Sequence, residues 1–421
     1  MSQETNNESA GPVYDIVVCG SGPAGLSAAL AAAERGAKVL VCEKQNRFST
    51  KLLASGGGKC NFTNALPENK FMDSFGRNGR FMTDALRVGG RDFLLDFLKK
   101  HDVEPVLEDG MYYFPSSGYA SDIQDAFMET ARTLGAEMKT GLQINRVIVD
   151  DNGNLTGVET GSGTYPCRKL ILAAGGTAMS ALGGTSSGLE LARAAGHTIV
   201  KPLPAMAPLL VQERYLYGLA GVSLPAAALS FSAERRHYSA SGEIVFTHNG
   251  ISGPAALDIS APAYRVFDRD GTLCLRFTPV DKMDMPKWIN QLLQMRKEET
   301  KKLVRNAIAK FMPHSLADEL TREYGIYNYT CGEMGNSLIE EFSHWLTMIP
   351  LHISALCPMD KAMAMSGGVS LKEVNPKTME SKIVKGLYFA GEILDLAGPC
   401  GGFHIQFAVA SGRLAGLSAA I

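Results

Sequence analysis

The sequence predicts an α/β fold: a discontinuous Rossmann-type dinucleotide-binding domain, interrupted by an inserted β domain and a small helical cap. Three observations support this prediction. Residues 14–43 contain an apolar strand, a glycine turn, an alanine-rich helix and a second apolar strand. A further glycine-rich strand and helix occupy residues 385–417, near the end of the chain. Between these segments, proline-punctuated strand-like text is followed by text with helical periodicity.

Length and charge limit the classes of protein that fit. The 421 residues are enough for two or three domains, and a hydrophobic fraction of 45% is typical of a globular protein. The 41 Lys and Arg residues against 43 Asp and Glu residues give a net charge of −2, without the basic footprint of a nucleic-acid-binding protein. No apolar stretch reaches the roughly 18 residues of a membrane span. We expect a small-molecule substrate, no nucleic-acid partner and no membrane partner.

Two features of the sequence bear on the cellular compartment of the protein: its first residues and its cysteines. Residues 1–12 are polar and acidic, so we expect a disordered tail rather than a signal peptide. The eight cysteines are scattered without a CxxC pair or a cluster at metal-ligand spacing. These features predict free thiols, no metal and a cytoplasmic protein. They do not indicate an oligomeric state.

Changes in composition predict the domain boundaries. We assign residues 13–200 and 353–421 to the dinucleotide-binding domain. Residues 201–280, where short strands and turns follow a cluster of prolines, form the inserted β domain. Residues 281–352 have helical periodicity and form the cap.

A glycine turn carries the main signal for a dinucleotide. Gly20, Gly22 and Gly25 follow an apolar strand and open a helix, with the spacing GxGxxG. The first glycine permits the tight turn, the second lets the backbone approach a pyrophosphate, and the third allows close helix packing. A purely structural glycine turn is the alternative. We assign the whole turn to cofactor binding: Gly20, Ser21, Gly22, Pro23, Ala24 and Gly25.

The end of the second strand supplies a carboxylate. Glu43 is the last residue of that strand and is placed to accept a hydrogen bond from a ribose hydroxyl. A solvated strand end with no ligand is the alternative.

The last part of the chain favours FAD over NAD as the bound dinucleotide. An apolar strand ends in Gly391 and Glu392, a pattern suited to holding ribityl hydroxyls. Gly401 and Gly402 then open a final helix, whose amides can face flavin N1 and O2, where negative charge collects on reduction. A glycine-capped terminal helix without a cofactor is the alternative. We also assign the first residues of this helix to the flavin: Phe403, His404 and Ile405.

Several other stretches have distinctive motifs. They are KLLASGGGKCNFTN at 51–64, FPS and ASD within 114–122, FTHNGISGP at 246–254, TMESK at 378–382 and GLYFAGEILD at 386–395. With these motifs the chain resembles the FAD-dependent oxidoreductases that include the BaiN-type bile-acid reductases and aminoacetone oxidase. The resemblance covers nearly the whole chain. It implies a Rossmann-type FAD domain with β and helical insertions.

The resemblance also implies further cofactor-binding residues. It puts the stretch 55–58 and Asn61 beside the cofactor, 174–176 near the dinucleotide, and Gly391 with Glu392 on the ribityl chain. The complete set that it adds to the glycine turn is Lys44, Lys51, Ser55, Gly56, Gly57, Gly58, Asn61, Val147, Ala174, Gly175 and Gly176.

The chain departs from this family at several positions. Family members often have Gly-Gly-Tyr-Asn where this chain has Gly-Gly-Phe-His at 401–404, and Thr where Cys400 stands. They often have Arg-Val-Phe-Pro at 112–115 and Thr-Gly-Asp-Gly at 185–188, where this chain has Tyr-Tyr-Phe-Pro and Thr-Ser-Ser-Gly. These departures concern the identity of the substrate rather than the fold.

Two histidines are candidates for catalysis. His404 lies just inside the last helix, and an imidazole beside the flavin could give a proton to a carbon that receives hydride. A helix-cap role is its alternative. His248 lies in the glycine-rich segment 246–254 and could close the site from the inserted domain; fixing that turn is its alternative.

We therefore predict an FAD-dependent oxidoreductase in which flavin N5 transfers hydride. The expected reaction is reduction of an activated carbon–carbon double bond in a small apolar carbonyl compound, such as a steroid-like or bile-acid-like acid. NAD(P)H would be a transient donor, because no second dinucleotide motif follows a strand. Alternatives are an amine oxidase that uses oxygen, a non-catalytic flavin-binding redox module, and a flavin enzyme acting on tRNA, against which the net charge argues.

Overall fold

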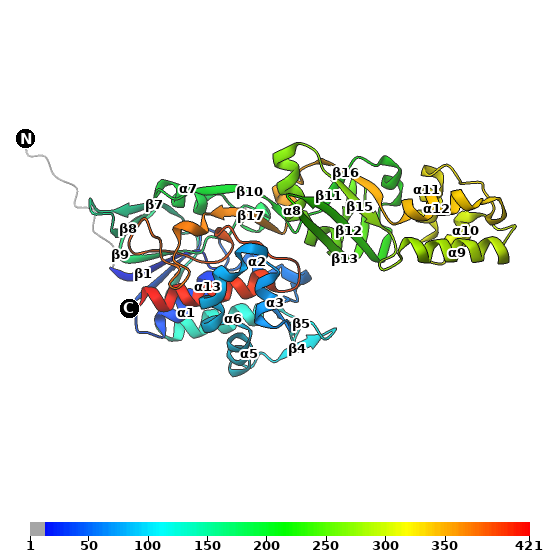
Figure 1. Ribbon diagram of the computed structural model, residues 1–421. Coiled ribbons are helices and arrows are strands. Elements are labelled where there is room, and N and C mark those ends of the chain that lie inside the picture. Colours follow the sequence, from blue (N-terminus) through cyan, green and yellow to red (C-terminus); the bar gives the residue numbers. More distant parts are fainter. Residues whose placement is uncertain (1–12) are drawn as a thin grey trace, which may run out of the picture. The chain divides into compact units, whose positions relative to one another are not determined.

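The computed structural model describes residues 13–421 (Figure 1). The segment 1–12, expected to be a disordered tail, lies outside the described residues. The chain forms two compact units: residues up to 202 together with 364–421, and residues 203–363. Within the described residues, no helix is long and apolar enough to cross a membrane.

The first unit is built on a seven-stranded sheet in the order β6-β2-β1-β9-β8-β7, with β18 paired to β9. β1, β2, β6, β9 and β18 run parallel, while β7 and β8 form an antiparallel extension. The bounds are β1 Tyr14–Cys19, β2 Val39–Cys42, β6 Glu137–Lys139, β7 Ile144–Val149, β8 Leu155–Thr160, β9 Gly163–Leu172 and β18 Leu387–Phe389. This sheet confirms the predicted α/β fold of Rossmann type. The carboxyl ends of its parallel strands form the edge where such sheets bind ligands.

The first and last helices of the chain pack side by side in this unit (Figure 1). They are α1, Pro23–Ala33, and α13, Phe403–Ala419. A Cβ atom at Gly412 would lie 2.1 Å from the backbone oxygen of Ala24, and one at Gly416 would lie 2.2 Å from that of Ala28. The small residues on both helices are therefore required by the close approach of the two backbones.

Shorter elements complete the first unit. Its other helices are α2 Thr50–Leu53, α3 Glu68–Asp73, α4 Thr83–Gly89, α5 Arg91–Lys100, α6 Ala120–Thr133 and α7 Ser187–Ala194. A small sheet contains β3 Thr63–Asn64, β5 Tyr112–Pro115 and β4 Pro105–Glu108. β10, Ile199–Ala205, pairs with β17, Ala364–Val369.

The second unit is a closed barrel in the order β11-β14-β13-β12-β15-β16. Its strands are β11 Leu209–Val211, β12 Ser223–Ala233, β13 Arg236–Thr247, β14 Gly250–Ser252, β15 Cys274–Thr278 and β16 Ile349–Ala355. Four helices lie between β15 and β16 in the sequence and gather together (Figure 1): α9 Met285–Glu298, α10 Val304–Ile308, α11 His314–Glu323 and α12 Asn336–Leu346. Trp288 is fully buried among them.

One helix of the second unit contradicts the sequence analysis. Short strands and turns were expected within 201–280, but residues 254–270 form α8, Pro254–Asp270, a helix of 17 residues. Pro262 lies inside it, and an internal proline normally argues against a helix because it removes a backbone hydrogen bond. Tertiary packing overrides that cost, since Ala255, Ile259, Ala263 and Val266 share a buried face at helical spacing.

Candidate active site

The glycine turn between β1 and α1 is shaped by contacts of the backbone with itself. Gly20 has φ of +99°, and a Cβ atom there would lie 2.6 Å from the oxygen of Ala173. A Cβ atom at Gly25 would lie only 1.9 Å from the oxygen of Gly20. At Gly22, by contrast, a Cβ atom would meet no described atom within 4 Å. Gly22 therefore has the open side that a phosphate needs at a helix N-terminus.

Glu43 holds this turn in place. Its Oε2 accepts hydrogen bonds from the backbone nitrogen of Ser21 at 3.0 Å and from the Ser21 hydroxyl at 2.6 Å, while Oε1 accepts from Gln45 N at 2.8 Å. Sequence reasoning predicted a ribose acceptor and missed this positioning role. Because each carboxylate oxygen has two lone pairs, the contacts leave capacity for a ribose hydroxyl. Ribose binding by Glu43 stays a prediction.

A partly buried ion pair joins Lys51 to Glu392, which follows β18. Lys51 Nζ lies 2.9 Å and 3.3 Å from the two carboxylate oxygens of Glu392, and Met365 N donates to the Oε1 atom of Glu392 at 3.0 Å. Burial pushes the pKa of Glu392 up, but the charge of Lys51, the charge that His404 carries when it is protonated in acid, and these hydrogen bonds outweigh it, so the net shift is downward. Glu392 is therefore a fixed carboxylate at neutral pH.

His404 lies close to this pair. Its Nε2 is 2.8 Å from the oxygen of Gly398 and 3.2 Å from the Gly398 nitrogen; the shorter contact assigns the ring proton to Nε2. Burial lowers the pKa of His404, and the nearby Glu392 carboxylate only partly opposes this shift. His404 is thus a neutral imidazole at pH 7, with Nδ1 free of that backbone contact.

Aromatic rings fix the loop that precedes α13. A Cβ atom at Gly398 would lie 2.7 Å from the Phe75 ring, and one at Gly401 would lie 2.6 Å from the Tyr112 ring. At Gly402, with φ of +81°, a Cβ atom would lie 2.6 Å from the backbone of Thr63. The sequence predicted glycines here as ligand contacts; the structure shows that the protein's own side chains and backbone also require them.

Several polar side-chain atoms of the first unit are buried without a hydrogen-bond partner among the described residues. Asn61 Oδ1, Thr63 Oγ1 and Ser366 Oγ are buried, and none has a hydrogen-bond partner within residues 13–421. Buried polar atoms normally have partners, so these oxygens indicate a polar ligand. Together with the open side of Gly22 and the fixed Glu392 carboxylate, they fit FAD. Thr63 and Ser366 were missed in the sequence, where only the position of Thr63 within the 51–64 motif gave a signal.

The other predicted cofactor residues are spread over the first unit. Gly56, Gly57 and Gly58 form a turn in which all three have positive φ, preceded by Ser55. The remaining residues lie as follows: Ala174, Gly175 and Gly176 after β9, Lys44 after β2, Val147 in the middle of β7, and Phe403 and Ile405 in the first turn of α13. A Cβ atom at Gly176 would lie 2.8 Å from Glu392 Oε1, which joins the segment after β9 to the Glu392 cluster.

His248 belongs to the other unit. It is exposed on the turn between β13 and β14 of the barrel. Its predicted catalytic role stays a prediction, because each unit is described only by itself.

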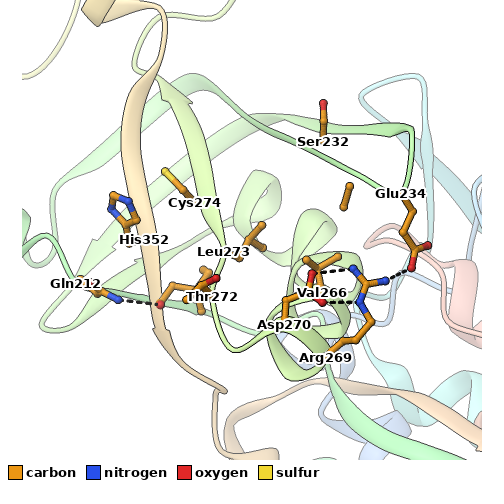
Figure 2. A pocket seen from close by; sticks show the side chains of 12 residues that line it. Gln212, Ser232, Glu234, Val266, Arg269, Asp270, Thr272, Leu273, Cys274 and His352 are labelled. Atoms are coloured by element: carbon orange, nitrogen blue, oxygen red, sulfur yellow. Dashed lines mark hydrogen bonds and ion pairs between the residues drawn. The ribbon is translucent and has the colours of Figure 1, made fainter.

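Figure 2 shows a pocket of about 620 Å³ in the barrel unit. The Arg269 guanidinium at its edge is already paired with Asp270 and Glu234. Cys274 lies opposite His352 on the neighbouring strand, and burial raises the pKa of its thiol, which disfavours a nucleophilic thiolate. No residue of the predicted site lines this pocket, so we do not assign the reaction to it.

Two histidines, the buried His197 and the partly buried His404, predict acid sensitivity of the fold. Burial lowers the pKa values of His404 and His197 in the folded protein, while both titrate near 6.5 when unfolded. The contribution of each neutral histidine to the free energy of unfolding is fully present above pH 6.5. It is lost as the pH falls from 6.5 through the pKa of the folded state, because the unfolded state binds the proton more tightly. Thermal unfolding should therefore show a falling melting temperature between pH 7 and pH 5. A flat profile over that range would contradict the assignment, and H197Q should reduce the slope.

Comparisons with known proteins agree with this geometry. Residues 14–418 match the family model described as HI0933-like protein Rossmann domain. The chain is 29% identical over 414 residues to a 3-dehydro-bile acid delta(4,6)-reductase of Clostridium scindens, covering 96% of this chain and 98% of the relative. It is also 29% identical over 421 aligned residues to a ribosomal RNA dihydrouridine synthase of Haemophilus influenzae, covering 96% and 97%.

A solved structure supports the fold alone. The 3-ketosteroid delta1-dehydrogenase from Sterolibacterium denitrificans has a TM-score of 0.53 and 12% identity, over 97% of this chain and 99% of that one. The family match spans both glycine elements and the inserted unit between them. The arrangement around Gly22 and Glu392 is thus part of a whole-length similarity, and the chain belongs to the HI0933-like Rossmann-domain family of FAD-dependent oxidoreductases.

Proposed function

We propose that this enzyme reduces a carbon–carbon double bond conjugated to a carbonyl group in a small apolar compound of the steroid or bile-acid class. NAD(P)H is the proposed electron donor. The full-length similarity to the Clostridium scindens reductase is the observation that carries the substrate class. The name of the second relative also describes reduction of a ring double bond next to a carbonyl, since dihydrouridine is uridine with that bond reduced.

Different residues of the chain have different proposed roles around the cofactor. FAD, when bound, supplies hydride transfer at its N5 atom. Asn61, Thr63 and Ser366 would donate to or accept from its polar groups, and the Glu392 carboxylate would accept from ribityl hydroxyls. Lys51 keeps that carboxylate ionised and fixed. The first-turn amides of α13, where no side chain among the described residues caps the N-terminus, would stabilise negative charge.

His404 is the proposed proton donor to the substrate carbon that does not receive hydride. Its imidazolium form, protonated at Nδ1 as well as at the Nε2 atom that faces Gly398, would give up the Nδ1 proton and return to the neutral imidazole. Replacing it with alanine should slow reoxidation of the reduced enzyme by substrate about 100-fold or more, the range of general-acid catalysis, and leave flavin reduction by the donor nearly unchanged. Stopped-flow measurement of the two half-reactions separates these effects. Equal slowing of both half-reactions, or of neither, would assign His404 a structural role through Gly398.

RNA is the second candidate substrate, favoured by the name of the second relative and by one basic segment of the second unit. Residues 296–310 carry the basic side chains Arg296, Lys297, Lys301, Lys302, Arg305 and Lys310 against Glu298 and Glu299. Nearby, the ring of Tyr327 lies 3.8 Å from the Arg305 guanidinium and 4.4 Å from that of Arg322. Basic and aromatic side chains together are typical of surfaces that bind single-stranded RNA.

An anaerobic titration of the purified flavoprotein tests the proposal. NADH and then NADPH are added while the visible flavin band is recorded. Bleaching by either donor is the expected result, and a band that stays oxidised would rule out a nicotinamide donor. In a separate assay in air-saturated buffer, peroxide release with an amine substrate, in which O2 takes the two electrons of the reduced flavin, would instead identify an oxidase.

Reoxidation then distinguishes the substrates. The reduced enzyme is mixed without oxygen with a steroid carrying a conjugated 3-keto group, or with protein-free ribosomal RNA. Return of the flavin band with the steroid alone supports the proposal. Return with RNA alone, accompanied by dihydrouridine in the digested RNA, would replace it with the second candidate.

A further inference from the structure

A network of polar contacts surrounds the buried His197 in the first unit, beside the strand that leads to Glu392. His197 Nε2 is 2.8 Å from the hydroxyl of Ser381, and His197 Nδ1 is 3.4 Å from a carboxylate oxygen of Glu373. The Nδ1 contact is an electrostatic one and not a hydrogen bond, whereas Glu373 accepts hydrogen bonds from the nitrogen and the hydroxyl of Thr198, at 2.8 Å and 2.7 Å. The His197 side chain is 0% exposed. The network therefore joins the segment after α7 to two segments that lie before β18 in the sequence.

The hydrogen bonds that Ser381 accepts determine where its hydroxyl proton points. Its Oγ accepts from Ile383 N at 3.0 Å and from Val384 N at 2.8 Å, which uses both lone pairs of the hydroxyl. The hydroxyl must then donate to His197 Nε2, so the neutral imidazole carries its proton on Nδ1, facing Glu373. The order Ser–His–Glu matches that of a hydrolase, but Ser381 is only 8% exposed and its lone pairs are occupied. This serine is a fixed structural acceptor rather than a nucleophile.

The network fixes the beginning of β18. Ser381 N donates to the oxygen of Leu387 at 2.7 Å, so the segment 381–387 closes into a tight loop. Phe389 N donates to the oxygen of Met379 at 3.0 Å, and the Phe389 ring stands edge-on to the His197 ring at 4.7 Å. Glu392 follows three residues after Phe389. The short strand β18 therefore connects this loop to the segment that carries Glu392.

We propose that His197 and Ser381 are positioning residues for the cofactor site, which hold β18 so that Glu392 meets the ribityl chain of FAD. The inference rests on the proposed role of Glu392. The proposal depends above all on the hydrogen bond between Ser381 and His197, because that bond holds the loop 381–387 against the ring of Phe389. Neither residue touches the cofactor in this proposal.

Three variants test the contact. H197L removes the acceptor and S381A removes the donor, and each should weaken FAD binding about tenfold. H197Q can place an amide oxygen near the position of Nε2, and it should restore affinity to within about threefold of the native value. Y14F is the matched control, because it removes a hydrogen bond at 2.8 Å to Glu137 in the same unit, at the start of β1. Affinity is measured by diluting the purified holoenzyme and following the fluorescence of released FAD.

A double-mutant cycle with E392A decides between positioning and general stability. If His197 acts through Glu392, the double variant H197L/E392A should bind FAD about as weakly as E392A alone. The inference would be overturned if the losses of FAD affinity in H197L and E392A were additive in the double variant. It would also be overturned if H197L lost no more FAD affinity than a Y14F variant of the same melting temperature, or if H197Q bound FAD as weakly as H197L. Normal affinity in E392A would overturn the proposed role of Glu392 itself. S381A with E392A provides the same cycle if H197L does not fold.

Discussion

Replacement of Glu392 with alanine is expected to lower FAD affinity about 10- to 100-fold, because hydrogen bonds to a charged acceptor contribute about 1.5–3 kcal/mol. The variant also leaves Lys51 without its partner at 2.9 Å and Met365 N without its acceptor. The purified protein should lose its yellow colour during dialysis, and added FAD should restore it only at high concentration. The affinity is read from fluorescence titration of the apoprotein with FAD.

A surface carboxylate provides the control for this variant. Glu159 pairs with Arg146 on the antiparallel extension of the same sheet, and both side chains are largely exposed. Exposed ion pairs contribute little, so E159A should retain FAD like the native enzyme. Full retention of FAD by E392A after the same dialysis would remove Glu392 from the cofactor site.

The second large effect is expected from the two glycines of the first turn. A Cβ atom at Gly25 would lie 1.9 Å from the oxygen of Gly20, which is a backbone atom and cannot swing aside as a flexible side chain could. G25A should therefore lower the free energy of unfolding by about 3 kcal/mol, as overpacking in a tight site does. Thermal unfolding of the apoprotein measures this loss.

G22A is the matched variant, with the same added methyl group three residues earlier. Its Cβ would meet no described atom within 4 Å, and the backbone φ of −65° is one that alanine adopts readily. The apoprotein should keep its melting temperature, while FAD affinity falls because the methyl group occupies the path of the pyrophosphate. Equal FAD affinity in G22A and the native protein would show that the pyrophosphate does not pass there.

The first turn of the fold could be predicted because its signals are local. The strand, the glycines and the alanine-rich helix of 14–33 each require their residue types for reasons that act over a few neighbours. The same holds for α13, which begins directly after Gly402. Local pattern failed for α8, where Pro262 lowers helix propensity and only packing against the barrel restores the helix.

The site was predictable only in part, for a related reason. Glycine motifs identified its backbone, but the side-chain partners depend on residues far apart in sequence. The contact between Lys51 and Glu392 joins positions 341 residues apart, and periodicity carries no information about such a pair. The unpartnered oxygens of Thr63 and Ser366 could be recognised only once burial was known.

The packing of α13 against α1 also constrains the order of events during synthesis on the ribosome. Gly412 and Gly416 must reach Ala24 and Ala28 before the two helices can bury each other, and they are made long after those alanines. The unit 203–363 lies entirely between them in the sequence and can fold while the first helix still waits for its partner. Its early folding shortens the effective loop that the two helices must close, which reduces the entropic cost of joining the ends of the chain. The nascent chain therefore gains its complete cofactor site only after α13 has been made.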